Sequence, residues 1–173
     1  MSMMRSTGVM VLCAISGVAG CASDAKAPAG GSAGSSNGGG SHVAATAGKI
    51  DTATYLAAIG DYKAFSKAPG FDKPQPSTGP HGETATVYIN AVMKTALSKT
   101  GLAAWPDGSL IVKDSFGPTG AASMTTVMER YGSSWYFAQY SPAGAFKAGG
   151  LDADVCVSCH AGGNDGLIAL ALP

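Results

Sequence analysis

The order of apolar and polar positions divides the chain into three parts. Residues 9–18 form a short apolar run, residues 22–48 contain almost no large apolar side chain, and residues 49–173 carry several short periodic segments. Only periodic segments of this kind can bury enough apolar surface to offset the entropy lost on ordering the chain. We therefore expect one folded domain of about 125 residues, spanning 49–173.

The first periodic segment of this domain predicts an amphipathic helix. Its apolar residues recur at spacings of three and four, after a possible cap at Asp51 or Thr52 and before Pro69-Gly70. They are Tyr55, Leu56, Ile59, Tyr62 and Phe65. A second, shorter helix is expected through Val92–Leu97, capped by Asn90 and ended by Gly101.

Four other segments alternate or are rich in β-branched residues, and Gly-rich or Pro-rich breaks separate them. They are Thr84–Ile89, Ser109–Lys113, Ser123–Arg130 and Ser134–Tyr140. Their spacing suits an antiparallel meander. The sequence therefore predicts an α+β fold, with an N-terminal helix and a compact antiparallel β-sheet domain.

The first 20 residues have the pattern of an export signal. Arg5 provides the positive end, the apolar run 9–18 is too short to span a bilayer, and small residues precede Cys21. The tetrapeptide Val18–Cys21 resembles the lipobox of bacterial lipoproteins, in which the cysteine is lipidated and becomes the mature N-terminus. An ordinary secretory signal, leaving Cys21 as an unpaired thiol, is the alternative. Both interpretations place the mature chain outside the cytoplasm.

Residues 21–48 are then a flexible Gly/Ser/Ala linker between a lipid anchor and the domain. In lipoproteins of the kind that the tetrapeptide resembles, a residue other than aspartate after the cysteine accompanies sorting to the outer membrane, and here Ala22 follows Cys21. The expected location is the periplasmic face of the cell envelope, with the membrane as a partner through the anchor.

Charge argues against nucleic acid as a partner. Eleven Lys and Arg balance eleven Asp and Glu, giving a formal net charge of zero. No overall field therefore favours a phosphate backbone, and no basic stripe is interleaved with aromatic residues that could stack on bases.

The segment Cys156–His160 carries the clearest chemistry. It reads Cys-Val-Ser-Cys-His, the attachment pattern of haem c. Two thiols at this spacing can add to the two vinyl groups of a porphyrin while the adjacent His160 reaches the iron. The alternatives are a Cys156–Cys159 disulfide or half of a zinc site, for which His42 and His81 would be the only other histidines.

Several blocks of residues together resemble the cytochrome P-460 family, which is related to cytochrome c-prime-beta. The blocks are Gly79–Gly82 with Val87–Asn90, Trp105–Lys113, Val127–Glu129 with Trp135-Tyr136, and Cys156–His160. The segment Asn164–Ile168 departs from the family pattern because it lacks an aromatic residue. The resemblance implies a β-rich domain with one covalent haem c, bound through Cys156, Cys159 and His160, with His160 as the iron ligand.

The same resemblance implies a role for Lys113, which matches the lysine that bonds to a porphyrin meso carbon in P-460 enzymes. The alternative is an edge-strand lysine with its ammonium group in water. An enzyme of this type would oxidise hydroxylamine or handle nitric oxide and pass electrons to a periplasmic electron-transfer partner. A non-catalytic nitric oxide binder or sensor and a simple electron carrier are the alternatives, and a homodimer is left open.

The remaining candidates have structural alternatives. Glu129 is a candidate catalytic base, although a solvated strand residue is the more frequent use of such a glutamate. His81 is expected to make a structural hydrogen bond in its turn rather than to bind iron. Met124 and Met128 are expected in the core rather than on iron.

Two further groups of residues are expected around the haem. Arg130 and Lys147 would neutralise its propionates, with surface placement as the equal alternative. Trp105, Trp135 and Phe116 are expected to pack around the macrocycle.

Overall fold

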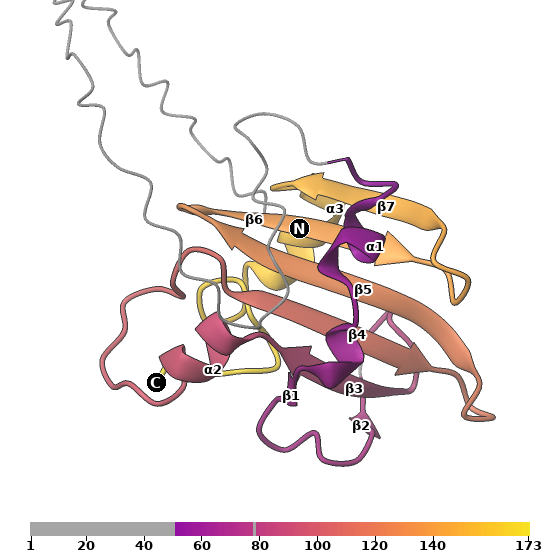
Figure 1. Cartoon of the computed structure of the whole chain (residues 1–173), viewed down its shortest axis with the longest axis horizontal. Coiled ribbons are helices and arrows are strands. Elements are labelled where there is room, and N and C mark those ends of the chain that lie inside the picture. The colour runs from indigo at the N-terminus through magenta and orange to yellow at the C-terminus, as the bar shows by residue number, and fades with distance from the viewer. Residues whose placement is uncertain (1–50, 78) are drawn as a thin grey trace, which may run out of the picture. The chain divides into compact units, whose positions relative to one another are not determined.

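An antiparallel sheet forms the centre of the computed structural model, which describes residues 51–77 and 79–173. The strand order is β1-β3-β4-β5-β6-β7, and β2 also pairs with β3 (Figure 1). The strands are β1 (Ser66–Lys67), β2 (Gln75–Pro76), β3 (Thr84–Ile89), β4 (Leu110–Phe116), β5 (Ala122–Tyr131), β6 (Ser134–Tyr140) and β7 (Phe146–Leu151). The α+β prediction is thus met at the level of a mostly antiparallel sheet with a few short helices.

The predictions for the start of the chain lie outside the described residues. These are the export signal 1–20, lipidation at Cys21, the linker 21–48 and the histidine at His42. They stay predictions from the sequence.

The helices are short. They are α1 (Tyr55–Ile59), a 3₁₀ helix (Tyr62–Ala64), α2 (Ala91–Ala96) and α3 (Asp154–His160). The continuous helix predicted through Phe65 is wrong, because α1 ends at Gly60, whose φ of +75° lies in the left-handed region. The longest described helix has seven residues, whereas crossing a bilayer takes about 20.

The predicted cap of α2 is confirmed. The Asn90 side-chain oxygen accepts a hydrogen bond from the Met93 amide at 3.0 Å and another from the Leu110 amide at 3.2 Å. The first bond pairs an amide in the first turn of α2 that has no partner within the helix, and the second pairs the amide of the first residue of β4. One side chain therefore joins α2 to the sheet.

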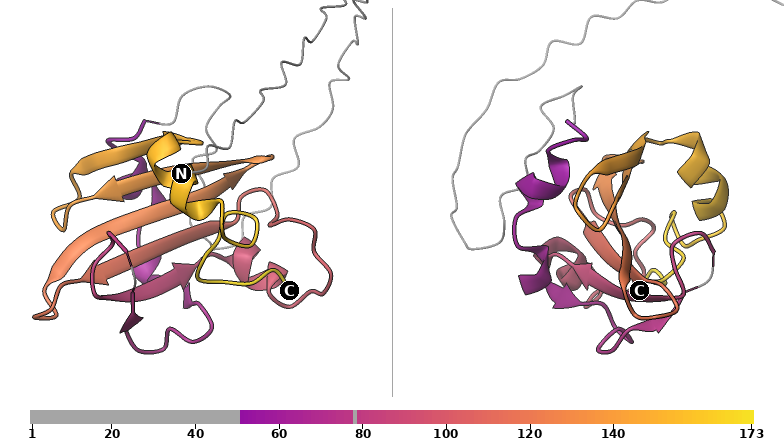
Figure 2. Two further views of the ribbon diagram at one scale, coloured as in Figure 1. Left: turned by 180° about the vertical axis from the view of Figure 1, so that it is seen from behind. Right: turned by 90° about the vertical axis from the view of Figure 1, so that its right-hand side faces the viewer.

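Residues on both faces of the sheet are buried. Apolar residues occupy consecutive positions along the strands, and consecutive side chains point to opposite faces. The face that we call the α3 face carries Val87, Ile111, Met128 and Phe137, which cluster with Cys156 and the C-terminal segment. The opposite face, the α1 face, buries a second cluster against α1, with Leu110, Val112, Val127 and Tyr136. Figure 2 shows α1 and α3 on opposite sides of the sheet.

The last strand, β7, was not predicted. It contains Gly149 and Gly150, which interrupt any alternation of apolar residues. Gly149 pairs with Ala138 of β6 at a φ of +139°, and a Cβ atom there would collide with the carbonyl oxygen of Phe137. The close approach of two backbones therefore requires the residue that hides the strand from sequence analysis.

Candidate functional site

The motif cysteines lie one turn apart on α3. Cys156 is buried in the core of the α3 face, whereas Cys159 is exposed, and both are free thiols. Burial raises the pKa of the Cys156 thiol, and the nearby Cys159 raises it further. The two thiols therefore lie three residues apart on one short helix.

His160 ends α3 with one ring nitrogen already engaged. Its Nδ1 lies 2.8 Å from the carbonyl oxygen of Gly166. Because a carbonyl oxygen only accepts, this contact requires the proton on Nδ1 and leaves the lone pair of a neutral ring on Nε2. Metal-binding histidines characteristically hold their second nitrogen in this way. The ring also contacts Phe137 of β6, at 5.2 Å between ring centroids.

The α3 face is covered in one row of residues and partly open in the next. Register places Ile111, Met128 and Phe137 in one row across the strands, and all three are buried. Two residues further along β4, Lys113 lies in the next row with Thr126 and Gln139. These three are only partly buried. The sheet therefore has a partly open strip, here called the Lys113 row, beside the part of the face that contains Phe137.

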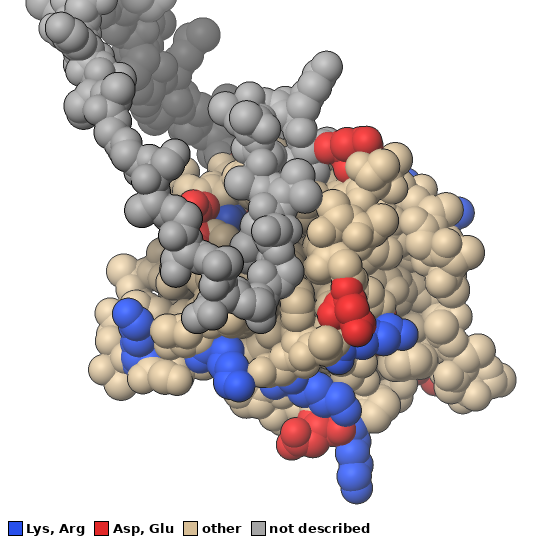
Figure 3. All heavy atoms as spheres, in the orientation of Figure 1, with Lys and Arg blue, Asp and Glu red and all other residues tan. Residues whose placement is uncertain are grey.

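Lys113 differs from the other lysines near the sheet. Figure 3 shows Lys and Arg side chains along the edge of the molecule formed by α2 and β1 to β3, with acidic side chains among them. The lysines between residues 51 and 100 are all exposed: Lys63, Lys67, Lys73, Lys94 and Lys99. Lys113 instead lies in a central strand, where burial lowers its pKa to about 8. An edge-strand lysine in open water is not what the structure contains.

His81 lies in the turn before β3 and interacts with the charges of Lys113 and His160. Burial, together with the charges of Lys113 and His160, lowers the pKa of His81 to about 4. Its Nδ1 is buried and has no hydrogen-bond partner among the described residues. Nδ1 therefore does not make the structural hydrogen bond expected for His81. Three basic side chains, His81, Lys113 and His160, interact electrostatically.

Glu129 does not join this group. Register places it between Leu110 and Tyr136, which belong to the α1 face, and it is 3% exposed. Side chains of consecutive strand residues point to opposite faces, so Glu129 points away from Lys113. The solvated alternative is therefore wrong, and Glu129 lies on the face opposite the one that carries Lys113.

Other predicted neighbours of the haem also have different surroundings. Arg130 is buried, and its Nη1 lies 3.0 Å from Asp165 Oδ1, so its charge is already paired. Lys147 is exposed on β7. Met128 lies in the core as expected, whereas Met124 and Phe116 are partly buried near the far ends of their strands.

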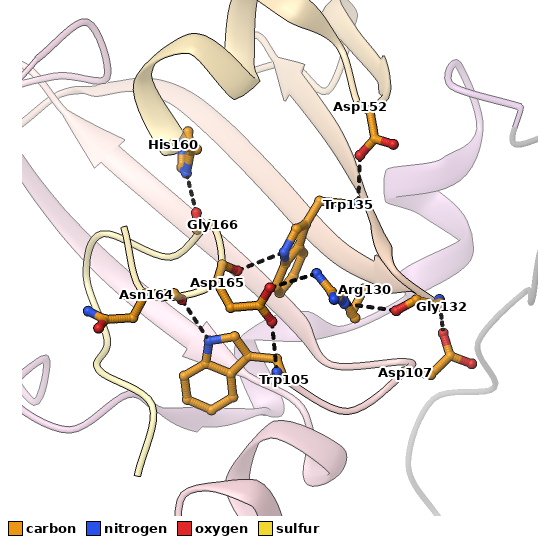
Figure 4. A network of polar contacts seen from close by, with 10 residues as sticks. All are labelled: Trp105, Asp107, Arg130, Gly132, Trp135, Asp152, His160, Asn164, Asp165 and Gly166. Carbon is orange, nitrogen blue, oxygen red and sulfur yellow. Dashed lines mark hydrogen bonds and ion pairs between the residues drawn. The ribbon is translucent and has the colours of Figure 1, made fainter. Parts of the chain in front are cut away.

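The two tryptophans bind the loop that follows α3 (Figure 4). Trp105 Nε1 donates to the Asn164 carbonyl at 3.2 Å, and Trp135 Nε1 donates to the Asp165 carbonyl at 2.8 Å. Sequence analysis missed this loop, although the departure of Asn164–Ile168 from the family pattern marked it. Its function becomes visible only when positions far apart in the chain are brought together.

The alternatives for the motif have little support in the described part of the chain. Residues 51–77 and 79–173 contain no group of three His, Cys, Asp or Glu side chains arranged to hold a metal ion. A zinc site at Cys156 and Cys159 would need further ligands of that kind. The two thiols also remain unbonded to each other.

Comparison with known proteins leaves the chemistry of the site to its own residues. No protein-family model matches this chain, and no match to it was found among curated proteins.

Proposed function

We propose that this chain is an exported, lipid-anchored mono-haem c protein of the P-460 type, acting in the redox chemistry of hydroxylamine or nitric oxide. Cys156 and Cys159 would hold the haem through thioether bonds, and His160 would bind its iron. Lys113 would lie beside the macrocycle. Electrons would pass to a periplasmic electron-transfer partner.

The observation that carries the proposal is the state of His160. Its Nδ1 is engaged by the Gly166 carbonyl, so Nε2 is the nitrogen left to bind a metal, directly after two free thiols at attachment spacing. The residues present therefore fit a haem c.

The Lys113 row, the partly open strip on the α3 face, supports the same proposal. Lys113, Thr126 and Gln139 lie on the face against which α3 packs, next to Phe137, which contacts the His160 ring. The unpartnered Nδ1 of His81 adds a buried polar atom that a bound group could satisfy. Polar side chains are thus available next to the expected position of the haem.

When bound, a haem supplies an iron centre that exchanges single electrons and takes a small ligand. The protein's own residues do the rest. His160 would supply an iron ligand through Nε2, and Phe137 contacts its ring. The depressed pKa of Lys113 leaves a substantial fraction of its amine unprotonated near pH 8, and only the neutral amine can form a bond to carbon.

The two candidate functions, an enzyme and a non-catalytic ligand binder, differ in whether Lys113 is bonded to the macrocycle. Formation of this cross-link would replace an amine N–H and a macrocycle C–H by one C–N bond. The protons and electrons released must be taken up by an oxidant, such as a peroxide. Without the cross-link, a nitric oxide binder becomes the better account, because the site would then offer an iron ligand and a partly open strip but no modified macrocycle.

Covalent attachment is tested by producing the full chain together with a haem c maturation system. Wild type and Cys21→Ser should both keep haem through denaturing electrophoresis, whereas the double variant Cys156→Ser/Cys159→Ser should lose it. The control removes a cysteine outside the motif. Complete extraction of haem from wild type by acidic acetone would refute covalent attachment.

The choice between enzyme and binder is tested at Lys113. Lys113→Ala should abolish a red-shifted Soret band and hydroxylamine oxidation while haem stays attached. Lys147→Ala, which removes an exposed lysine of β7, should change neither. If wild type already shows an ordinary five-coordinate spectrum, and peptide mass analysis finds Lys113 unmodified, the enzyme proposal is refuted and the nitric oxide binder replaces it.

A further inference from the structure

The loop after α3 has a backbone that needs outside support. Asp165 has a φ of +48° and Gly166 a φ of +82°. The left-handed conformation costs a residue with a Cβ atom roughly 1 kcal/mol, so Asp165 is held there by its contacts. Immediately after it comes Gly166, whose carbonyl oxygen binds His160 Nδ1.

Asp165 is held by groups from three distant parts of the chain. Arg130 Nη1 donates to its Oδ1 at 3.0 Å, and the Trp105 amide donates to its Oδ2 at 2.8 Å. Its backbone carbonyl accepts from Trp135 Nε1 at 2.8 Å. Both carboxylate oxygens and the main chain are therefore engaged at once (Figure 4).

Arg130 is itself fixed. Its Nε donates to the Gly132 carbonyl at 2.9 Å, and the Gly132 amide donates to Asp107 Oδ1 at 2.7 Å. Its guanidinium group lies 5.4 Å from the centre of the Trp135 ring. With 8% of the side chain exposed, the ion pair to Asp165 is shielded from solvent screening. The pair is thus a rigid support rather than a mobile surface contact.

Trp135 also limits the position of Gly166. A Cβ atom on Gly166 would lie 2.9 Å from Trp135 Nε1, so the ring packs directly against the backbone of this glycine. The plane of the peptide that carries the Gly166 carbonyl is therefore constrained by Trp135 on one side and by Asp165 at the preceding position.

We propose that Asp165, held by Arg130, Trp105 and Trp135, is a positioning residue that fixes the Gly166 carbonyl on His160 Nδ1 and so sets the direction and basicity of His160 Nε2. As a statement about an iron ligand, this rests on the proposed function. A hydrogen bond at Nδ1 increases electron donation by the ring and favours the ferric state of the iron it binds.

The test compares two aspartates with matched backbones. Asp165 and Asp152 both have left-handed φ values, +48° and +46°, and the carboxylate of each accepts a hydrogen bond from the backbone amide of a tryptophan. Asp152 Oδ1 accepts from the Trp135 amide at 2.9 Å, so its hydrogen bond is to β6 rather than to the loop after α3. Asp165→Asn removes the charge paired with Arg130 and one of the two acceptor oxygens, so it should perturb His160. Asp152→Asn keeps the oxygen that accepts from the Trp135 amide and should not.

In the haem-loaded full chain, Asp165→Asn should keep its haem. The frequency of the iron–histidine stretch should fall, and the equilibrium constant for reduction should rise about tenfold. Trp135→Phe, which removes the indole donor to Asp165 together with the part of the ring that packs against Gly166, is the second variant if Asp165→Asn fails to fold. Wild-type values of the stretch and the reduction equilibrium in every folded variant would overturn the proposal.

A readout that does not depend on haem separates this inference from the proposed function. Nitrogen NMR of the full chain reports which ring nitrogen of His160 carries the proton. Wild type should show it on Nδ1, and Asp165→Asn should show a mixture of both forms. If wild type never takes up haem but this shift occurs, the proposed function fails and the positioning role stands; if the proton distribution is unchanged, the positioning role fails.

Discussion

Burial gives Lys113 a different chemistry from that of the lysines at the surface. A solvent-exposed ammonium group keeps its proton far above neutral pH, whereas burial in a central strand lowers the pKa of Lys113 to about 8. The residue name and its place in a motif could be predicted from the sequence. The desolvation of its amine could not be predicted, because it depends on β4 being a central strand that pairs with β3 on one edge and β5 on the other.

This shift makes the stability of the haem-free chain depend on alkaline pH. Between pH 8 and 10.5 the unfolded chain still holds the Lys113 proton while the folded chain has released it. Stability of wild type relative to Lys113→Met should therefore rise across this window, by about 2 kcal/mol. Urea denaturation at several pH values measures it, with Lys147→Met as the control. A difference that stays flat with pH would contradict the assigned pKa direction.

His81 should act at acidic pH. Its pKa in the folded chain is lowered to about 4 from 6.5, so below pH 6.5 the unfolded chain binds the proton first. Wild type should lose stability relative to His81→Gln as the pH falls from 6.5 to 4, by about 1 kcal/mol after screening of the partly buried ring. Denaturation curves test this, with His42→Gln as the control, and identical pH profiles would count against it.

Two residues show where a sequence pattern stops being informative. Glu129 and Lys113 both lie in predicted strands, but which face each side chain takes depends on the phase of the alternation. The sheet has buried residues on both faces, so the pattern contains no clear polar side from which that phase could be read. Arg130 could not be assigned either, because its partner Asp165 is 35 positions away.

At the level of elements, the strands with β-branched and aromatic residues were predictable and the glycine-dependent ones were not. β3 and β6 have the bounds that the sequence predicts, whereas β4 extends beyond Lys113 to Phe116. β7 escaped because close backbone packing selects glycine there, and α1 ended early at a glycine. In β7 and at the end of α1, the part that sequence analysis missed is one in which glycine has a geometric function.

Gly149 provides a test of that argument. Gly149→Ala should destabilise the fold by about 2–3 kcal/mol, because its Cβ atom would meet the Phe137 carbonyl at a φ that side chains rarely adopt. Gly144→Ala is the control: its φ is +81° but its surroundings are open, so a cost of about 1 kcal/mol is expected. Urea denaturation compares the two, and equal losses would show that the contact with β6 is unimportant.

At the scale of the whole molecule, the haem attachment proposed for α3 connects the function of the domain with the export signal predicted at the start of the chain. Haem c is attached outside the cytoplasm, so a domain that carries the proposed haem would require export, which the pattern of residues 1–21 predicts. The Gly/Ser/Ala segment 22–48 would then give the domain a reach of about 30 Å from the membrane. Such a reach would let a fixed anchor coexist with collisions between the haem domain and an electron-transfer partner.

The anchor is tested by phase partition of the full chain. Wild type should enter the detergent phase, because lipid on Cys21 adds about 0.8 kcal/mol of membrane affinity for each buried methylene group. Cys21→Ser should stay in the aqueous phase and keep its haem, since the thiols of α3 are unchanged. Cys13→Ser, inside the segment expected to be cleaved, should behave as wild type. Equal partition of wild type and Cys21→Ser after signal cleavage would replace the lipoprotein by a freely diffusing periplasmic protein, whose haem domain would then need no tether to reach its partner.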